Sequence, residues 1–283
     1  MSIQSKKHLF RLLNVDSKEI HLIIENINDY YKERYLSKKD KYGDVKIDSK
    51  GNIEKRKINP SVGRLKIIQS RIQSRILSKI DLPFYIFGGA KKKDNVKNAK
   101  QHQGKKYKFV TDLRNYFPSI NNKEVYRMFV RNKFSTDVAS ILTKLVTLNG
   151  SIPQGAPTST TLANLVFIDV GNKIDIFCKK NGIIFTAFVD DLSFSSKEDF
   201  KHLIPFLIKI VSKKFLIHHK KTFYCSKCSV TGVIVNNNNL SLPNYFYDKL
   251  YKFTSNPKRH EGLKLYINKV NYISSVKNKK IKF

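Results

Sequence analysis

The stretch IIFTAFVDDLSFSS, residues 183–196, places two adjacent carboxylates, Asp190 and Asp191, between two apolar runs. Both runs are rich in aromatic and β-branched residues, so the stretch predicts two strands joined by a tight turn. At such a turn the two carboxylates repel each other and lose contact with water, and a bound cation would relieve that conflict. The stretch therefore indicates both a hairpin and a cation site.

Asp112 is the best candidate for a third carboxylate, because it directly follows a short predicted strand, residues 107–111. Carboxylate oxygens are hard ligands that suit Mg²⁺. Two Mg²⁺ ions about 3.5 to 4 Å apart can activate an attacking hydroxyl and stabilise a leaving pyrophosphate. Taken alone, an Asp-Asp pair is more often a simple turn, and Asp112 could equally cap a helix or turn.

The charge balance indicates an anionic partner. Among 283 residues, 54 are Lys or Arg and 22 are Asp or Glu, which gives a formal net charge of +32. The hydrophobic content of 41% is enough for a buried core and excludes a disordered basic tail. Nucleic acid is a better partner than a membrane, because the basic residues run along the whole chain and no stretch has the roughly 18 to 20 apolar residues of a span.

The cysteines give a weaker signal. Cys178, Cys225 and Cys228 form an odd set, and the N-terminal residues lack the apolar core of a secretory signal, so we expect a reducing, cytoplasmic location. His218 and His219 lie just upstream of the last two cysteines, so four side chains of the kinds that bind zinc lie close together in the sequence. Their spacing is irregular and overlaps predicted strands, so structural zinc is not favoured.

Apolar spacing predicts helices alternating with short strands, and this pattern favours an α+β fold with an antiparallel sheet backed by helices on one side. The predicted helices cover residues 16–35, 62–80, 122–134, 137–148, 157–177 and 200–211, followed by small amphipathic helices in the tail. The predicted strands cover residues 107–111, 183–188, 192–196, 221–226 and 230–236, with a separate hairpin over 41–58.

Five motifs occur in a fixed order along the chain. TDLRNYFPSI (111–120), IPQGAPTSTTLANLVF (152–167) and AFVDDLSF (187–194) resemble motifs A, B and C of a reverse transcriptase palm. NAKQH (98–102) resembles the NAxxH element and VTGVIVN (230–236) the VTG element of bacterial retron reverse transcriptases. Five ordered motifs are far more specific than any one of them, and the resemblance covers roughly residues 45–240.

The resemblance implies a right-hand polymerase with fingers at 1–105 (118–150 contributing), a palm at 106–236 and a small thumb at 237–283. It implies an RNA-directed DNA polymerase of the bacterial cytoplasm that uses two Mg²⁺ ions and dNTPs. Its template and primer would be a cognate structured noncoding RNA, copied into a branched RNA-DNA product called msDNA. Such enzymes commonly act with a separate effector protein in antiphage defence.

By position in the motifs, Asp112, Asp190 and Asp191 would be the catalytic, metal-binding carboxylates. The family writes its third motif as Tyr-x-Asp-Asp, whereas this chain has Phe188 at the first position. The change leaves metal binding intact but puts any contact from the tyrosine hydroxyl to primer or template in doubt.

Three further residues would shape the nucleotide pocket. Phe117 matches the aromatic steric gate that leaves no room for a 2'-hydroxyl and so selects dNTPs. Its structural alternative is a core ring. Gln154 and Gly155 would lie near the base pair and template, although a Gln-Gly pair alone is a common turn.

Two cations would contact the dNTP phosphates. Arg56 resembles the fingers arginine, whose planar fork suits phosphate. A companion lysine on the hairpin would also contact the phosphates, and Lys46 and Lys50 are both candidates for it. Lys221 matches the lysine that would protonate the leaving pyrophosphate, with Lys220 as the adjacent alternative.

The NAxxH and VTG elements would bind RNA through five residues. The residues matched are Asn98, His102, Val230, Thr231 and Gly232. Each element also has a structural alternative. The first could be a loop held by its own hydrogen bonds, and the second a strand that turns at its glycine.

Three rival functions remain. Phe117 argues against an RNA-dependent RNA polymerase, and missing maturase and endonuclease regions argue against a group II intron-like reverse transcriptase. A catalytically silent RNA-binding scaffold would not need Asp112, Asp190 and Asp191.

Overall fold

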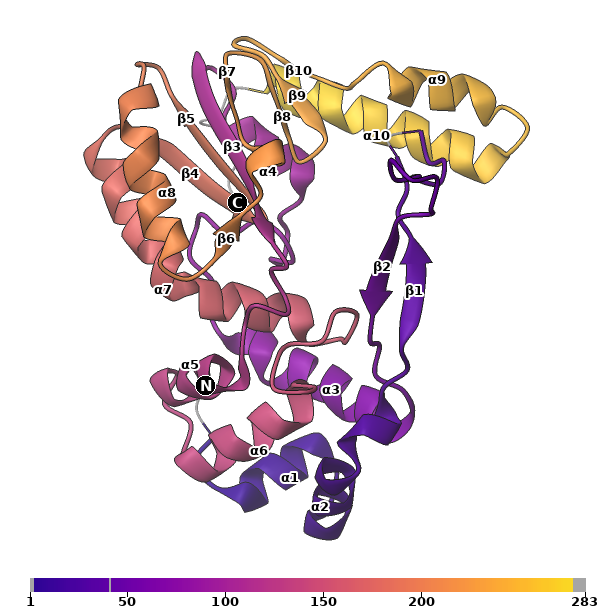
Figure 1. The fold of residues 1–283 in the computed structure, drawn as a ribbon, viewed down its shortest axis with the longest axis vertical. Coiled ribbons are helices and arrows are strands. Elements are labelled where there is room, and N and C mark those ends of the chain that lie inside the picture. Colours follow the sequence, from indigo (N-terminus) through magenta and orange to yellow (C-terminus); the bar gives the residue numbers. More distant parts are fainter. Residues whose placement is uncertain (1–2, 41, 277–283) are drawn as a thin grey trace. The chain divides into compact units, whose positions relative to one another are not determined.

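The computed structural model describes residues 3–40 and 42–276. The chain divides into two compact units, whose elements are labelled in Figure 1. The first unit comprises residues 1–40, 44–83 and 115–168, and the second comprises residues 41–43, 84–114 and 169–283. The predicted boundaries at 105 and 236 do not coincide with this division, because residues 84–105 group with the sheet and the C-terminal helices. The fingers, palm and thumb stay a prediction, and the last seven thumb residues, 277–283, lie outside the described residues.

The first unit is mainly helical. Its helices are α1 (Lys6–Leu13), α2 (Ser17–Glu25), α3 (Gly63–Arg75), α5 (Asn122–Arg131), α6 (Thr136–Val146) and the part of α7 (Ser159–Lys180) up to Ile168, with short 3-10 turns at Ile27–Tyr30 and Leu77–Lys79. Helices α1, α2, α5 and α6 begin at side-chain caps, as at Asn121, which forms a reciprocal capping box with Glu124. Apolar residues of α3 and α6 are fully buried and form the core: Leu65, Ile68, Ile72, Val138, Leu142 and Leu145.

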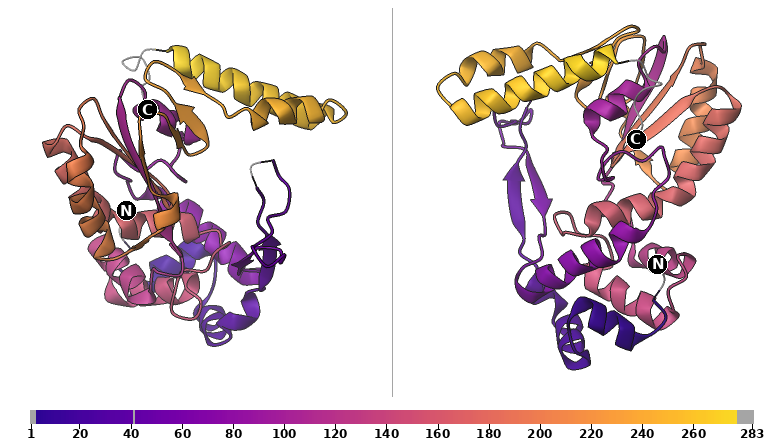
Figure 2. Two further views of the ribbon diagram at one scale, coloured as in Figure 1. Left: turned by 45° about the horizontal axis from the view of Figure 1, so that its top comes forward. Right: turned by 180° about the vertical axis from the view of Figure 1, so that it is seen from behind.

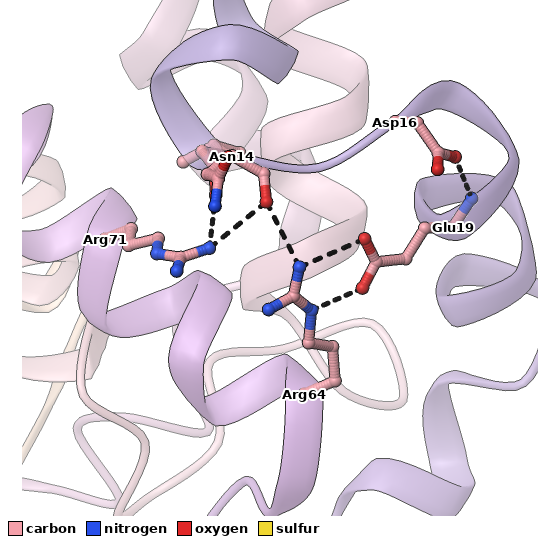
Figure 3. Close-up of polar contacts among 6 residues, drawn as sticks. Asn14, Asp16, Glu19, Arg64 and Arg71 are labelled. Carbon is pink, nitrogen blue, oxygen red and sulfur yellow. Dashed lines mark hydrogen bonds and ion pairs between the residues drawn. The ribbon is translucent and has the colours of Figure 1, made fainter.

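Two arginines of α3 hold the junction between α1 and α2. Asn14 ends α1 in the left-handed conformation with φ 51°. Figure 3 shows that its carbonyl accepts hydrogen bonds from Arg64 at 3.1 Å and from Arg71 at 3.2 Å. Arg64 also forms a two-pronged ion pair with Glu19 in the first turn of α2, where Asp16 caps the helix (Figure 3). These contacts fix the turn between the two helices.

A hairpin of β1 (Arg34–Ser37) and β2 (Lys55–Ile58) also belongs to the first unit. Arg34 pairs with Ile58 in an antiparallel register, so the hairpin starts earlier than the predicted 41–58. The predicted helix over 16–35 is wrong beyond Glu25. Asn26 ends the helix, and Tyr35 lies in β1, since an exposed aromatic residue suits a strand as well as a helix.

The second unit is built on an antiparallel sheet. Its strands are β3 (Tyr107–Arg114), β4 (Ile184–Phe188), β5 (Asp191–Ser196), β6 (Leu216–Ile217) and β7 (Phe223–Cys225). The spatial order is β4-β5-β3-β6, with β7 also paired to β3. The predicted α+β class with an antiparallel sheet backed by helices is confirmed.

Helices cover both faces of this sheet rather than one. Phe109, Phe185 and Phe194 share a face, because they are direct partners in the register of β3, β4 and β5. On the opposite face, His102 at the end of α4 (Asn95–Gln101) reaches Thr186 and Ser195. Figures 1 and 2 show α4 on one side of the sheet, and α7 and α8 (Ile204–Ser212) on the other.

A smaller sheet joins the C-terminal helices to α4. Its strands are β8 (Cys228–Val230), β9 (Val233–Val235) and β10 (Leu240–Ser241), followed by α9 (Tyr245–Lys252) and α10 (Pro257–Ser275). Buried residues from α4, these strands and α10 form one apolar cluster that includes Val96, Ala99, Val233, Val235, Val270 and Ile273. Across the described part of the chain, no helix has the length and apolar character needed to cross a membrane.

Candidate active site

The predicted hairpin at residues 183–196 is present and tight. Phe188 pairs with Asp191 at the ends of β4 and β5, so Val189 and Asp190 alone make the turn. Val189 has φ 59°, in the left-handed region that a β-branched residue rarely occupies. The surrounding structure therefore imposes the shape of this turn.

Backbone contacts fix the three predicted catalytic aspartates, of which Asp112 and Asp191 lie on the neighbouring strands β3 and β5 and Asp190 lies in the turn before β5. Asp112 of β3 is the direct register partner of Asp191 of β5, and paired residues point to the same face of a sheet. The amide of Leu113 donates to the carbonyl of Asp190 at 2.9 Å, and the amide of His218 donates to the carbonyl of Asp112 at 2.8 Å. The sheet brings these three carboxylates together, as the sequence predicts.

The negative charges of the three carboxylates repel one another. Burial first, and then the charges of Asp190 and Asp112, raise the pKa of Asp191 to about 7, while Lys221 acts in the opposite direction. Lys221 Nζ lies 2.9 Å from Asp112 Oδ2. Its partial burial would lower the pKa of Lys221, but the hydrogen bond to Asp112 and the nearby carboxylates raise it overall. One ammonium thus partly balances three carboxylates.

The donor set fits Mg²⁺ in its chemistry. Among the described residues, no three His, Cys, Asp or Glu side chains are already arranged as a metal cage. Asp112 instead binds Lys221, and the pKa of Asp191 is raised first by burial and then by the charges of Asp190 and Asp112. Oxygen donors in this state suit a hard divalent cation, which would add the positive charge that the single ammonium of Lys221 does not supply.

A cavity of about 490 Å³ opens beside the carboxylates within the second unit. Its lining includes Asp112, Asp191, Lys221, Lys227, Cys228 and Thr231. The lining thus combines carboxylates with lysines, and this combination suits a ligand that carries phosphate and approaches a metal.

Comparison with known proteins gives the same result as the motifs. No protein-family model matches the chain. The retron Se72 reverse transcriptase of Salmonella heidelberg (strain 579083-10) is 30% identical over 247 residues, which cover 82% of this chain and 62% of that protein. The retron Ec48 reverse transcriptase of Escherichia coli is 28% identical over 261 residues, 85% of this chain and 61% of that protein. In sequence, the chain is therefore similar to retron reverse transcriptases over most of its length.

A third relative, the retron Ec86 reverse transcriptase of Escherichia coli, is 28% identical over 193 residues, 66% of this chain and 60% of that protein. The chain thus spans about three fifths of the length of these relatives. Two solved structures resemble the chain remotely. A foamy viral protease-reverse transcriptase in complex with double-stranded DNA is 17% identical with a TM-score of 0.47, over 87% of this chain and 39% of that chain. Apo telomerase from Candida tropicalis is 12% identical with a TM-score of 0.41, over 48% of this chain and 35% of that chain.

The NAxxH element lies at α4 rather than in a loop, and the side chains of Asn98 and His102 face the protein. Asn98 and His102 have no exposed surface. His102 Nδ1 lies 2.7 Å from Ser195 Oγ and Nε2 lies 2.8 Å from Thr186 Oγ1. As placed, His102 holds α4 against β4 and β5, and neither Asn98 nor His102 offers surface for direct contact with RNA.

The VTG element packs against the same helix. Val230 is buried, while Thr231 is half-buried with φ 47° and Gly232 is exposed with φ 84°. Asn98 Nδ2 donates to Thr231 Oγ1 at 3.4 Å, and Asn95 donates to the Thr231 carbonyl at 3.1 Å. The two elements therefore form one structural unit. RNA contact stays a prediction, with exposed surface only at Thr231 and Gly232.

The other predicted nucleotide-binding residues lie in the first unit. Arg56 is exposed on β2, and Phe117 is half-buried beside Tyr116, with ring centres 5.7 Å apart. The carbonyl of Gln154 accepts a hydrogen bond from Asn59 at 2.7 Å. Gly155 has φ 105°, which only glycine adopts easily. Their roles with dNTP stay predictions.

Cys225 and Cys228 form a disulfide between the end of β7 and the start of β8. The odd cysteine count gives no sign of this pairing, which arises because the turn brings their Cα atoms to 5.9 Å. In this pairing neither sulfur is a free thiolate, the form in which cysteine binds zinc. Cys178 is a free, buried thiol whose pKa is raised by burial and by Asp175.

Sequence reasoning missed one buried cation near the site. Lys108 of β3 has no exposed surface, and its ammonium donates to the carbonyls of Lys105 and Ser226, each at 2.6 Å. It thereby ties β3 to the turn that carries the disulfide. The available signal was strand alternation, which places Lys108 on the same face as Val110 and Asp112.

Proposed function

We propose that the chain is an RNA-directed DNA polymerase that copies a structured noncoding RNA. The observation that carries this proposal is the register pair of Asp112 and Asp191, with Asp190 in the adjoining turn. The net charge of +32 supports a polyanionic template and product. The retron-type sequence supports RNA as the template.

The catalytic step would rest on the carboxylates and one lysine. Asp112, Asp190 and Asp191 would hold two Mg²⁺ ions, which supply positive charge for the attacking hydroxyl and the leaving pyrophosphate. Lys221 carries its ammonium beside Asp112, and its raised pKa keeps it protonated at neutral pH. It would donate a proton at Nζ to the leaving pyrophosphate.

The substrate would be selected by residues of the first unit. The Phe117 ring would exclude the 2'-hydroxyl of an NTP, and Arg56 would bind the triphosphate through its planar fork. Gln154 and Gly155 would contact the base pair and template, and the φ of 105° at Gly155 favours glycine at this position.

The finer proposal is retron chemistry. A cognate RNA would serve as template and would supply a priming 2'-hydroxyl, so that the product is branched RNA-DNA, or msDNA. The protein would act with a separate effector in antiphage defence. This part is supported by the family resemblance alone.

Primer extension tests the main proposal. Purified protein is given Mg²⁺ and a primed RNA template, with four dNTPs in one arm and four NTPs in the other. DNA from the dNTP arm is expected. RNA from the NTP arm alone would indicate an RNA polymerase, and RNA binding without either product would indicate a scaffold.

Branching needs a separate test. The gene is expressed with its flanking DNA, and the nucleic acid that copurifies is treated with a debranching enzyme. A product that splits into RNA and DNA supports the retron proposal. An unbranched DNA product would contradict it and favour the group II intron-like alternative.

A further inference from the structure

The segment Tyr85–Gly88 runs along the edge strand β4 up to the catalytic turn. Ile86 forms a parallel bridge with Ala187, and the amide of Phe87 donates to the Ala187 carbonyl at 2.8 Å. In return, the Ala187 amide donates to the Tyr85 carbonyl at 2.8 Å. These residues are buried, so the segment and β4 form one rigid strip.

Gly88 lies at the end of this strip, against the turn itself. A Cβ atom on Gly88 would lie 2.5 Å from the Val189 amide nitrogen, 2.7 Å from Val189 Cγ2 and 2.8 Å from the Phe188 carbonyl carbon. Two of these three atoms are backbone, and real Cβ atoms do not approach so closely. The φ of Gly88 lies outside the left-handed region, so the need for glycine is one of space.

The segment has little freedom to move away. The Lys93 ammonium donates to the carbonyls of Phe84 at 2.5 Å and Ile86 at 2.9 Å. The Tyr85 hydroxyl donates to Asn172 Oδ1 on α7 at 2.8 Å. A side chain at position 88 would therefore displace the turn rather than the segment.

We propose that Gly88 is a positioning residue for the catalytic turn. Its missing side chain lets the backbone of Val189 sit where it does, in the left-handed conformation. Asp190 and Asp191 follow directly, so the position of Val189 sets where their carboxylates point. The inference rests on the proposed function, in which these carboxylates hold Mg²⁺, an ion with a strict demand for octahedral geometry.

The test compares Gly88→Ala with Gly262→Ala. Gly262 lies in α10, where a Cβ would meet no atom within 4 Å and φ is ordinary, so it is a matched control. The probe is Mn²⁺ alone, titrated into each protein without RNA and followed by the electron paramagnetic resonance of the free ion. Primer extension then gives kcat and the dNTP KM, and thermal unfolding checks folding.

We expect Gly88→Ala to weaken Mn²⁺ binding and to lower kcat, each by roughly tenfold or more, because a small misplacement of reacting groups is costly. The dNTP KM should change by less than about threefold, since no triphosphate contact is removed. Gly262→Ala should match the wild type in Mn²⁺ affinity, kcat and dNTP KM. A folded Gly88→Ala protein with wild-type Mn²⁺ affinity and kcat would reduce Gly88 to a packing residue and overturn the proposal.

Two more variants keep the test decisive. Adding Val189→Gly to Gly88→Ala removes Cγ2 and relaxes the turn, so part of the Mn²⁺ affinity should return. If Gly88→Ala does not fold, Lys93→Met loosens the segment without adding atoms, and unchanged Mn²⁺ affinity there counts against the proposal. A wild-type protein that binds Mn²⁺ but makes no DNA defeats the proposed function, while the Mn²⁺ comparison still decides the role of Gly88.

Discussion

Lys221 Nζ lies 2.9 Å from Asp112 Oδ2. Asp112 lies on β3, and Asp190 lies in the two-residue turn that leads into the neighbouring strand β5. This ion pair places one cation among three carboxylates, and it leaves Asp191 with a pKa raised to about 7, mainly by burial. An ionised Asp191 therefore lowers the stability of the folded protein when no metal is bound. Such a cost is compatible with the proposed binding of a divalent cation, whose positive charge would offset it.

Asp191→Asn should stabilise the metal-free protein at pH 8. The Asp191 carboxyl has a folded-state pKa above its unfolded value of 3.8, so its native state loses stability as pH rises from about 4 to about 7 and stays less stable above that. The neutral amide removes this penalty, on the order of a few kcal/mol. Urea unfolding in EDTA at pH 5 and pH 8 measures it.

Asp199→Asn is the control, because hydrogen bonds from Tyr224 and from the Lys201 amide lower the pKa of Asp199. That replacement should bring no gain at pH 8. An Asp191→Asn protein no more stable than the wild type at pH 8 would contradict the crowding of charge at this site.

The buried His102 should make the protein sensitive to acid. Burial first, and then the charge of Lys108, lower the pKa of His102 to about 3. Between pH 6.5 and 3 the unfolded state binds the proton and the folded state does not, so stability falls as pH falls through this window. The expected slope from this group is about 1.4 kcal/mol per pH unit.

The slope is measured by urea unfolding of the wild type, His102→Gln and His202→Gln between pH 4 and 7. His202 is exposed and serves as the control. The His102→Gln slope should be shallower than the other two. Equal slopes in all three proteins would mean that His102 does not stay neutral in the folded state.

Phe117→Val should admit ribonucleotides. A smaller side chain at the proposed steric gate makes room for the 2'-hydroxyl, so the ratio of kcat/KM for NTP over dNTP should rise by about tenfold or more while dNTP use continues. Single-nucleotide extension on an RNA template measures this ratio. Phe206→Val, on the exposed face of α8, is the control. An unchanged ratio would remove Phe117 from the nucleotide pocket.

RNA binding should weaken steeply with salt. Many phosphate contacts imply a loss of roughly a thousandfold in affinity between 50 and 200 mM salt. Fluorescence anisotropy with a labelled structured RNA gives the slope of log K against log salt. A flat line would show that the charge of +32 is not used for phosphate binding.

The sequence predicted the catalytic hairpin because its signals are local. The apolar runs on both sides of Asp190 and Asp191 define two strands, and the motif order supplied Asp112 as their partner. The direct register of Asp112 with Asp191 is a finding of the structure, because strand pairing is not given by a local pattern.

Other features depend on contacts between distant segments, which no local pattern reveals. Asn98 and His102 are polar and suggest a surface, yet the hydroxyls of Thr186 and Ser195 satisfy His102 in the interior. Gly88 reads as part of a flexible loop, and only the turn at Val189 explains why it has to be glycine.

The most direct test of the central claim is primer extension on an RNA template with Mg²⁺ by the wild type, Asp112→Asn, Asp190→Asn, Asp191→Asn and Asp175→Asn. Asp175 lies on α7, paired with Lys179, and serves as the control. We predict DNA synthesis by the wild type and Asp175→Asn, and a loss of roughly a thousandfold or more in each of the other three folded proteins. Synthesis at wild-type rates by any of those three would contradict the account.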